Sequence, residues 1–232
     1  MTSALDTTLV PIMLRPALES GDRFTRAEFE ARSLARPDLK QVELIEGVVY
    51  VAPPKGVRSH GLPAGMMLGW LGLYVAETPG LISASFTTVR LDDTNVAQPD
   101  ALLAFERTAD SKPRGDADDF FAGPPELIVE ISASSASYDL HDKKQAYERN
   151  GVREYVVVIV EQQRVVWFEL IAGRYQEQAA VEGIHRSRLF PGLWLDVAAL
   201  FDNRFPRLLA TLQSGLATPE HAAFVARRPP AQ

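Results

Sequence analysis

One acidic residue inside an apolar strand constrains this chain more than any other feature of its sequence. Residues 124–160 predict a buried strand, a serine-rich turn, a charged helix and a second apolar strand. Glu130 lies inside the first of these strands, and Lys143 lies on the helix that follows. Because an ionised carboxylate is costly to bury alone, the strand requires a cationic side chain or a metal ion beside Glu130.

The composition is that of a folded protein with one domain or two small ones. The chain has 232 residues, of which 46% are hydrophobic and 23% are charged. It contains no cysteine, which excludes disulfide bonds and thiolate metal sites. We find no secretory signal near Met1 and no apolar run as long as a membrane span, so we expect a cytoplasmic protein without a membrane partner.

The net charge also restricts the possible functions. A value of −6 argues against a general nucleic-acid coat, which normally has a basic surface. It does not exclude an enzyme that brings a metal ion to phosphate groups, because acidic metal ligands contribute to such a charge.

The N-terminal region predicts a loose arm followed by a helix. Residues 1–22 show little periodicity and are expected to form the arm. Thr25 and Glu28 have the spacing of a capping box, which predicts a helix over about 26–35. Pro37 is expected to end that helix.

A hairpin and a glycine-rich helix are expected next. Segment 42–53 alternates around Glu46-Gly47, a dipeptide typical of a two-residue β-hairpin turn. Ser59 is expected to cap a second helix that reaches about residue 76. Four glycines at near-helical spacing predict that this helix packs closely against the sheet.

The remaining chain predicts further strands and a helical end. Segments 81–91 and 96–106 alternate like half-buried strands, and the polar residues 107–123 predict an exposed connection. A meander and a short strand with a following helix are expected after residue 160. We therefore place the main domain at 23–202 and expect a helical, Pro-rich appendage at 203–232.

Two carboxylates and a lysine could support metal-dependent chemistry. Mg²⁺ takes oxygen ligands, typically one or two protein carboxylates with waters and substrate phosphate oxygens. Asp100 follows Pro99 and lies 30 residues before Glu130, so the two acids can meet if their strands are neighbours. A nearby lysine, such as Lys143, could orient or help to deprotonate the attacking water.

The same residues belong to a set of motifs that resembles a known family. The motifs are Gln98-Pro99-Asp100, PPELIVEIS at 124–132 and YDLHDKKQAYERNGVREYVVV at 138–158. Their order and spacing resemble the Uma-type family of bacterial restriction-endonuclease-like proteins, within the PD-(D/E)xK nuclease superfamily. The likeness extends to VELIEGVVYVAPP, to the Ser-His-Gly at 59–61 and to LFPGLWLDVAALF, and covers roughly residues 24–201.

The resemblance implies a fold and an activity. The fold is of the α/β (α+β) class, a single restriction-endonuclease-like domain with a mixed, mainly antiparallel sheet flanked by helices. The activity is hydrolysis of phosphodiester bonds in DNA with Mg²⁺ or Mn²⁺. Comparable nucleases imply a homodimer.

It also implies the roles of single residues. Asp100 and Glu130 resemble the motif acids that bind the metal. The superfamily's usual lysine, two residues after the glutamate, is replaced by Ser132, and the Uma-type pattern places a lysine on the following helix instead. Lys143 matches that lysine, with Asp139 four residues before it and Tyr147 four residues after it. We therefore expect Asp100, Glu130 and Lys143 to be catalytic.

Two further matches and one departure accompany this pattern. Glu43 matches an acid in the first hairpin, and His60 matches a histidine at a helix start; both are expected to lie at the rim with Ser132, Asp139 and Tyr147. The usual Ser-Pro-Ser after the glutamate is Ser132-Ala133-Ser134 here. This departure puts the turn geometry, and with it the activity, in question.

Simpler interpretations remain for several of these residues. Asp100 could shape a turn, Asp139 and Lys143 could form an exposed ion pair on a helix, and Tyr147 could be a core aromatic. The serines could be turn or cap groups, since no nucleophile elbow surrounds them. Histidines with zinc-ligand spacing are lacking.

The alternative function is a catalytically weak or inactive nuclease-fold module that acts in binding or assembly. The acidic net charge and the altered serine turn favour it. A nuclease should instead have a basic rim, which could include Lys55, Arg58 and Lys143. No motif favours a small-molecule hydrolase.

Overall fold

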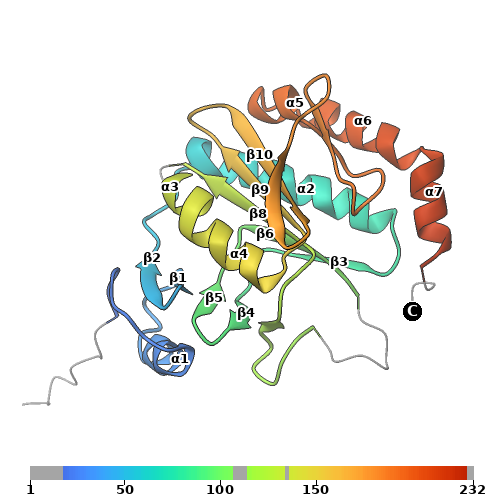
Figure 1. The fold of residues 1–232 in the computed structure, drawn as a ribbon. Helices are drawn as coiled ribbons and strands as arrows, with labels where there is room; N and C mark the ends of the chain where they lie inside the picture. The colour runs from blue at the N-terminus through green and yellow to red at the C-terminus, as the bar shows by residue number, and fades with distance from the viewer. Residues whose placement is uncertain (1–17, 107–113, 134–135, 229–232) are drawn as a thin grey trace, which may run out of the picture.

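The computed structural model describes residues 18–106, 114–133 and 136–228. Parts of four predictions therefore lie outside the described residues: the arm at 1–17, the connection at 107–113, the serine-rich turn at 134–135 and the C-terminal end at 229–232. The described elements form two larger sheets, a short two-stranded ribbon and the helices around them (Figure 1).

The larger sheet has six strands in the order β11-β10-β9-β8-β6-β3. Its one parallel pair is β8 with β9, whose connection contains a helical segment, and the other neighbours are antiparallel. The strands are β3 (Leu81–Ala84), β6 (Ala101–Phe105), β8 (Leu127–Ser132), β9 (Glu154–Ile159), β10 (Arg164–Ile171) and β11 (Arg174–Gln178).

The smaller sheet has five strands in the order β2-β1-β5-β4-β7, parallel only between β4 and β7. They are β1 (Val42–Ile45), β2 (Val48–Val51), β4 (Val89–Asp92), β5 (Asn95–Ala97) and β7 (Phe121–Ala122). The ribbon pairs β12 (Ile184–Arg186) with β13 (Trp194–Asp196).

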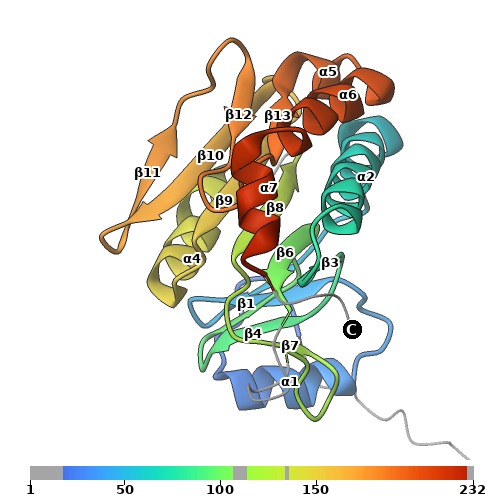
Figure 2. The ribbon, with the colours of Figure 1, turned by 90° about the vertical axis from the view of Figure 1, so that its right-hand side faces the viewer.

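Helices cover both faces of the larger sheet. Figure 2 shows α2 and α6 on one face, α4 on the other, and α1 beneath the smaller sheet. The helices are α1 (Arg26–Leu34), α2 (Leu62–Ala76), α3 (Ala136–Tyr138), α4 (Lys144–Asn150), α5 (Val197–Phe201), α6 (Phe205–Leu216) and α7 (Pro219–Ala226). Two π-helical turns, η1 (Val57–Gly61) and η2 (Asp139–Lys143), precede α2 and α4. The predicted fold class, an α+β domain with mostly antiparallel sheets flanked by helices, is confirmed.

Alternation along β8 decides which way Glu130 points. Leu127, Val129 and Ile131 belong to the core cluster formed with α2 and α6, whereas Ile128 belongs to the cluster formed with α4. Successive side chains of a strand point to opposite faces. Glu130 therefore shares the face of Ile128 and points toward the helical segment that carries Lys143.

The two predicted strands at 81–91 and 96–106 are each broken, and this break creates the junction between the sheets. The first becomes β3 in the larger sheet and β4 in the smaller one, and the second becomes β5 and then β6. Both breaks coincide with backbone that cannot continue a regular ladder: Phe86 has a positive φ of 51°, and Pro99 lacks an N–H. The Phe86 N–H donates to the Pro99 carbonyl at 3.2 Å, which ties the two breaks together.

Local signals at the N-terminal side are confirmed in part. The Thr25–Glu28 capping box begins α1, and Glu46 and Gly47 form the hairpin turn with φ of 53° and 72°. Ser59 does not cap the second helix as predicted. The helical segment begins earlier, at η1, and its first residue follows Gly56 without a side-chain cap.

The predicted role of the glycines in the second helix is wrong. A Cβ on Gly69 would meet the ring of Phe205 on α6, so that glycine allows contact between helices, and a Cβ on Gly65 or Gly72 would meet nothing within 4 Å. The sheet packs instead against large residues of α2 such as Trp70.

The predicted boundaries at 22 and 202 do not separate loose segments from the domain. Leu18 is buried in a cluster with α1 and β1, and the Gly21 N–H donates to the Val49 carbonyl. At the other end, Leu208 and Leu212 of α6 are fully buried in the same core as α2. Leucines four residues apart lie on one face of a helix, which explains why α6 completes the core. Within the described residues, no helix is both long and apolar enough to cross a membrane.

Candidate active site

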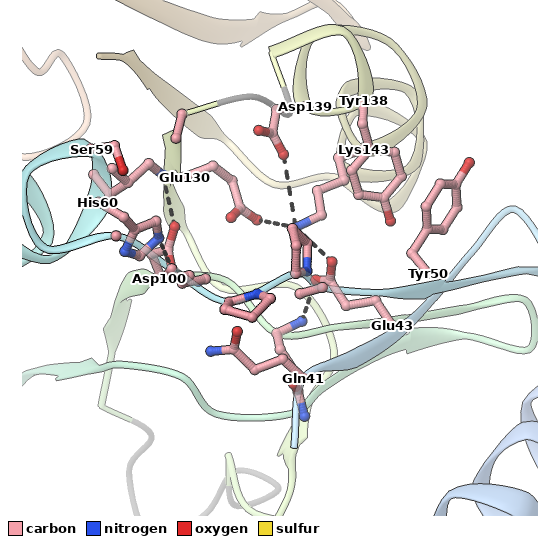
Figure 3. Close-up of a pocket in the computed structure, with 18 of the residues that line it drawn as sticks. Gln41, Glu43, Tyr50, Ser59, His60, Asp100, Glu130, Tyr138, Asp139 and Lys143 are labelled. Carbon is pink, nitrogen blue, oxygen red and sulfur yellow. Dashed lines mark hydrogen bonds and ion pairs between the residues drawn. The ribbon is translucent and has the colours of Figure 1, made fainter. Parts of the chain in front are cut away.

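A pocket of about 500 Å³ lies where the two sheets meet. Its walls come from β1 and β2, from the loop that leads into η1, from the end of β8 and from η2. Figure 3 shows Lys143 between Glu130, Glu43 and Asp139, and Asp100 beside His60. The pocket thus brings together residues that are up to 120 positions apart in the sequence, from Gln41 to Glu161.

Asp100 begins β6 at the junction of the sheets, and its carboxylate is almost fully buried. Its Oδ1 lies 2.6 Å from Lys55 Nζ and 2.9 Å from His60 Nε2. Its Oδ2 accepts a hydrogen bond from the Ile131 N–H at 2.8 Å, directly beside Glu130. This bond links the two predicted metal ligands through the backbone of β8.

Glu130 is held by two side chains from the helical segment. Its Oε1 lies 3.0 Å from Lys143 Nζ and accepts a hydrogen bond from the Tyr147 hydroxyl at 2.8 Å. Residues at i and i+4 share a helix face, so one face of the η2–α4 segment supplies both donors. Lys143 therefore points inward.

Glu43 and Asp139 complete the surroundings of Lys143. Glu43 Oε2 lies 2.9 Å from Lys143 Nζ, and its Oε1 accepts from the Gln98 N–H at 2.7 Å. Asp139 Oδ1 lies 3.9 Å from the same ammonium. The interpretation of Asp139 and Lys143 as an exposed surface pair is wrong, because both side chains are about 95% buried.

The other predicted site residues take distinct places. His60 is buried in η1 and contacts Asp100, and Tyr147 is fully buried with its ring edge toward Tyr155. Ser132, at the position of the usual superfamily lysine, is fully buried at the end of β8 and does not line the pocket. Both π-helical turns carry pocket residues, which agrees with the frequent occurrence of such turns at functional sites.

The two motif acids have opposite pKa shifts. Burial raises the pKa of Asp100, but the contacts with His60 and Lys55 outweigh this effect and the net pKa is lowered. Burial raises the pKa of Glu130 well above its usual value, opposed by Lys143 and reinforced by the negative charge of Asp100. Burial alone would lower the pKa of Lys143, yet Glu130, Glu43 and Asp139 raise it, so this lysine remains an ammonium.

Several residues that shape the pocket were not predicted from the sequence. Lys55 was expected only in a basic rim, whereas it contacts Asp100 directly. Tyr138 lies with its ring 5.4 Å from Lys143 Nζ and 3.9 Å from the ring of Tyr50. Tyr50 also donates to Asp142 at 2.9 Å. The only available signal for Tyr138 was its position directly before Asp139 in the helical segment.

The lining of the pocket suits a divalent cation by charge. Five carboxyl groups and two lysines line it, a formal charge of −3 when His60 is neutral. Asp100 and Glu130 offer the hard oxygen ligands that Mg²⁺ and Mn²⁺ accept. Across the described ranges, no three His, Asp or Glu side chains are grouped as a complete metal site, so water and substrate oxygens would have to supply the remaining ligands.

The mostly antiparallel sheets flanked by helices form a restriction-endonuclease-like fold. The chain belongs to the Uma2 family, described as "Putative restriction endonuclease", whose profile matches residues 26–198. A crystal structure of a "putative nuclease belonging to DUF820" from Anabaena variabilis shares the fold, with a TM-score of 0.55. The two chains are 14% identical over 70% of this chain and 90% of the other. A search of curated proteins finds no match.

Proposed function

We propose that this protein hydrolyses phosphodiester bonds in DNA with the help of Mg²⁺ or Mn²⁺. The observation that carries the proposal is the position of Lys143. The strand lacks a lysine after Glu130, and a lysine from the helical segment reaches the same carboxylate at 3.0 Å. Membership in the family described as a restriction endonuclease supports the choice of substrate.

Each side chain then has a specific task. Asp100 and Glu130 would hold the cation, which when bound supplies positive charge to the phosphate under attack. Because the pKa of Lys143 is raised, its ammonium would donate hydrogen bonds to water or to a phosphate oxygen and would not act as a base. Glu43 and Asp139 hold that ammonium, and Tyr147 fixes Glu130. Homodimerisation and a cytoplasmic location stay predictions.

The test combines metal binding with cleavage. Mn²⁺ binding is measured by electron paramagnetic resonance and by calorimetry for the wild type, Asp100→Asn and Glu130→Gln, and cleavage is measured on plasmid and oligonucleotide DNA. We expect both variants to weaken Mn²⁺ binding at least tenfold (about 1.4 kcal/mol) and to abolish cleavage. Glu177→Gln, an exposed acid outside the pocket, is the matched control. Cleavage that survives Glu130→Gln would contradict the proposal.

One observation favours a binding or assembly module as the second candidate. Lys55 and Lys143 already pair with Asp100 and Glu130, so each of the two motif acids has a cationic partner without a metal ion. A module of this kind would bind Mn²⁺ no more tightly than Glu130→Gln does and would leave DNA intact.

A further inference from the structure

Phe86 is an exposed aromatic residue beside Lys55, which lines the pocket, and it is held in an unfavourable backbone conformation. Its side chain lies at the junction between β3 and β4, and the residue is 46% exposed. Its φ of 51° makes it the one aromatic residue among the non-glycine positions with positive φ in the described part of the chain. A bulky residue rarely adopts this conformation, which costs of the order of 1 kcal/mol or more.

The backbone fixes Phe86 next to a predicted metal ligand. Its N–H donates to the carbonyl of Pro99, the residue directly before Asp100. Strained residues that the surrounding structure holds in place cluster at ligand-binding sites. The position of the ring is therefore determined by the same junction that positions Asp100.

Lys55 connects this ring to the pocket. Its ammonium lies 5.2 Å from the ring centroid of Phe86 and 2.6 Å from Asp100 Oδ1. The Lys55 side chain is 31% exposed, whereas Asp100 is buried, so the lysine lies between solvent and the acid. An aromatic face, a positive charge and a predicted metal-binding carboxylate thus follow one another from the surface inward.

We propose that Phe86 and Lys55 form a binding lip for an unpaired nucleotide beside the scissile phosphate. The base stacks on the Phe86 ring, and Lys55 leaves Asp100 to contact the adjacent phosphate when a cation takes its place. Stacking on an aromatic side chain needs a free base face, which single strands, flaps and frayed ends offer and paired duplex does not. This proposal rests on the proposed function and narrows its substrate to DNA with unpaired bases.

Binding is measured by fluorescence anisotropy with a labelled single-stranded oligonucleotide and with a hairpin duplex of the same sequence. Ca²⁺ replaces Mg²⁺ so that cleavage does not interfere. The wild type should bind the single strand at least tenfold more tightly than the duplex. Phe86→Ala should weaken single-strand binding by roughly fivefold or more, as expected for loss of one stacked base, and leave duplex binding unchanged.

Three variants separate stacking from simple unfolding. Phe86→Trp keeps an aromatic face and should retain single-strand binding. Phe86→Asn, which tolerates positive φ, should keep or raise the melting temperature while it weakens binding. Leu34→Ala, at a residue of α1 that is 81% exposed, is the control for loss of an exposed apolar side chain. It should change the affinity for neither the single strand nor the duplex.

The role of Lys55 has its own signature. Lys55→Gln should weaken single-strand binding and, in the absence of DNA, strengthen Mn²⁺ binding roughly fivefold, because the partly exposed pair with Asp100 no longer competes with the cation. Effects of equal sign on both ligands would contradict the proposed exchange.

The outcomes distinguish this inference from the proposed function. Equal affinity for single strand and duplex, or no effect of Phe86→Ala, overturns the lip even if the wild type cleaves DNA. If single-strand binding depends on Phe86 but the protein never cleaves DNA, the binding lip is supported and the proposed nuclease activity is contradicted.

Discussion

At the scale of single residues, Glu130 shows how a strand can bury an acid. Its carboxylate accepts hydrogen bonds from Lys143 and Tyr147, which lie on the helical segment that packs against this face of the sheet. A pair of buried charges is stable only when both are well compensated, and removal of one partner leaves the other charge unpaired. The geometry of the pocket therefore depends on keeping both members of each buried ion pair, such as Lys143 and Glu130.

Sequence analysis could predict the participants of this cluster better than their contacts. The unfavourable placement of Glu130 in an apolar strand indicated a partner, and the four-residue spacing of Lys143 and Tyr147 indicated a shared face. The contact between Lys55 and Asp100 could not be predicted, because it depends on where a loop 45 residues upstream crosses the junction of two sheets.

Lys143→Met should lower the free energy of unfolding by about 3 kcal/mol, because Glu130 and Glu43 lose their shared cation. The double variant with Glu130→Gln should lose at least ~1 kcal/mol less than the sum of the two single variants, as expected for directly coupled residues. Urea unfolding of the wild type, the two single variants and the double variant measures this double-mutant cycle.

Lys144→Met is the matched control for this cycle. Lys144 is the next residue along the helical segment and lies over the ring of Phe168, outside the cluster. Its loss should cost less than about 1 kcal/mol. Equal costs for the two lysine variants would show that the buried charges are not coupled.

At the scale of elements, two local signals were reliable and a third, the predicted Ser59 cap, was not, and the long-range signals failed at the strand breaks. The capping box of α1 and the hairpin turn at Glu46-Gly47 need only neighbours in sequence, and both are confirmed. The breaks at Phe86 and Pro99 depend on which sheet each half-strand joins. Alternation of apolar residues is the same on both sides of a break, so the sequence predicted continuous strands.

Helix α6 offers a test of its place in the core through its glycine. A Cβ on Gly215 would meet the carbonyl oxygen of Gly192 and lie 2.9 Å from the Trp194 ring. Because backbone atoms cannot easily move away, Gly215→Ala should lower the free energy of unfolding by about 1–3 kcal/mol.

Gly72→Ala is the matched control, on the open side of α2, where nothing lies within 4 Å of the new Cβ. It should raise the free energy of unfolding by about 0.5–1 kcal/mol through its higher helix propensity. Thermal unfolding of both variants gives the comparison. If Gly215→Ala raised the free energy of unfolding, α6 would not pack closely against the β12–β13 ribbon and the loop that contains Gly192.

At the scale of the whole molecule, stability should depend on pH through a histidine far from the pocket. His185 of β12 is buried against Trp167, with ring centroids 5.6 Å apart, and burial lowers its pKa. Its Nδ1 has no hydrogen-bond partner among the described residues, so a proton there would be buried without an acceptor.

The sign of the effect follows from the direction of this shift. A histidine with a lowered pKa in the folded state binds its proton more readily when unfolded. Its contribution to stability is complete above its ordinary pKa near 6.5 and is lost as the pH falls below that value. Urea unfolding measures the free energy of unfolding at pH values between 7.5 and 5. As the pH falls, this free energy should decrease less for His185→Phe than for the wild type. The variant His141→Gln, at an exposed histidine, should lose as much as the wild type.

The pocket residues extend from Gln41 to Glu161, and β8 pairs with β9, which ends at Ile159. A chain still emerging from the ribosome cannot assemble these groups until it has been made as far as Glu161, and α6 must follow to close the core. Any chemistry at the junction of the sheets therefore starts only after the residues of α6 have been made. For a protein that would act on DNA, this order keeps unfinished chains harmless.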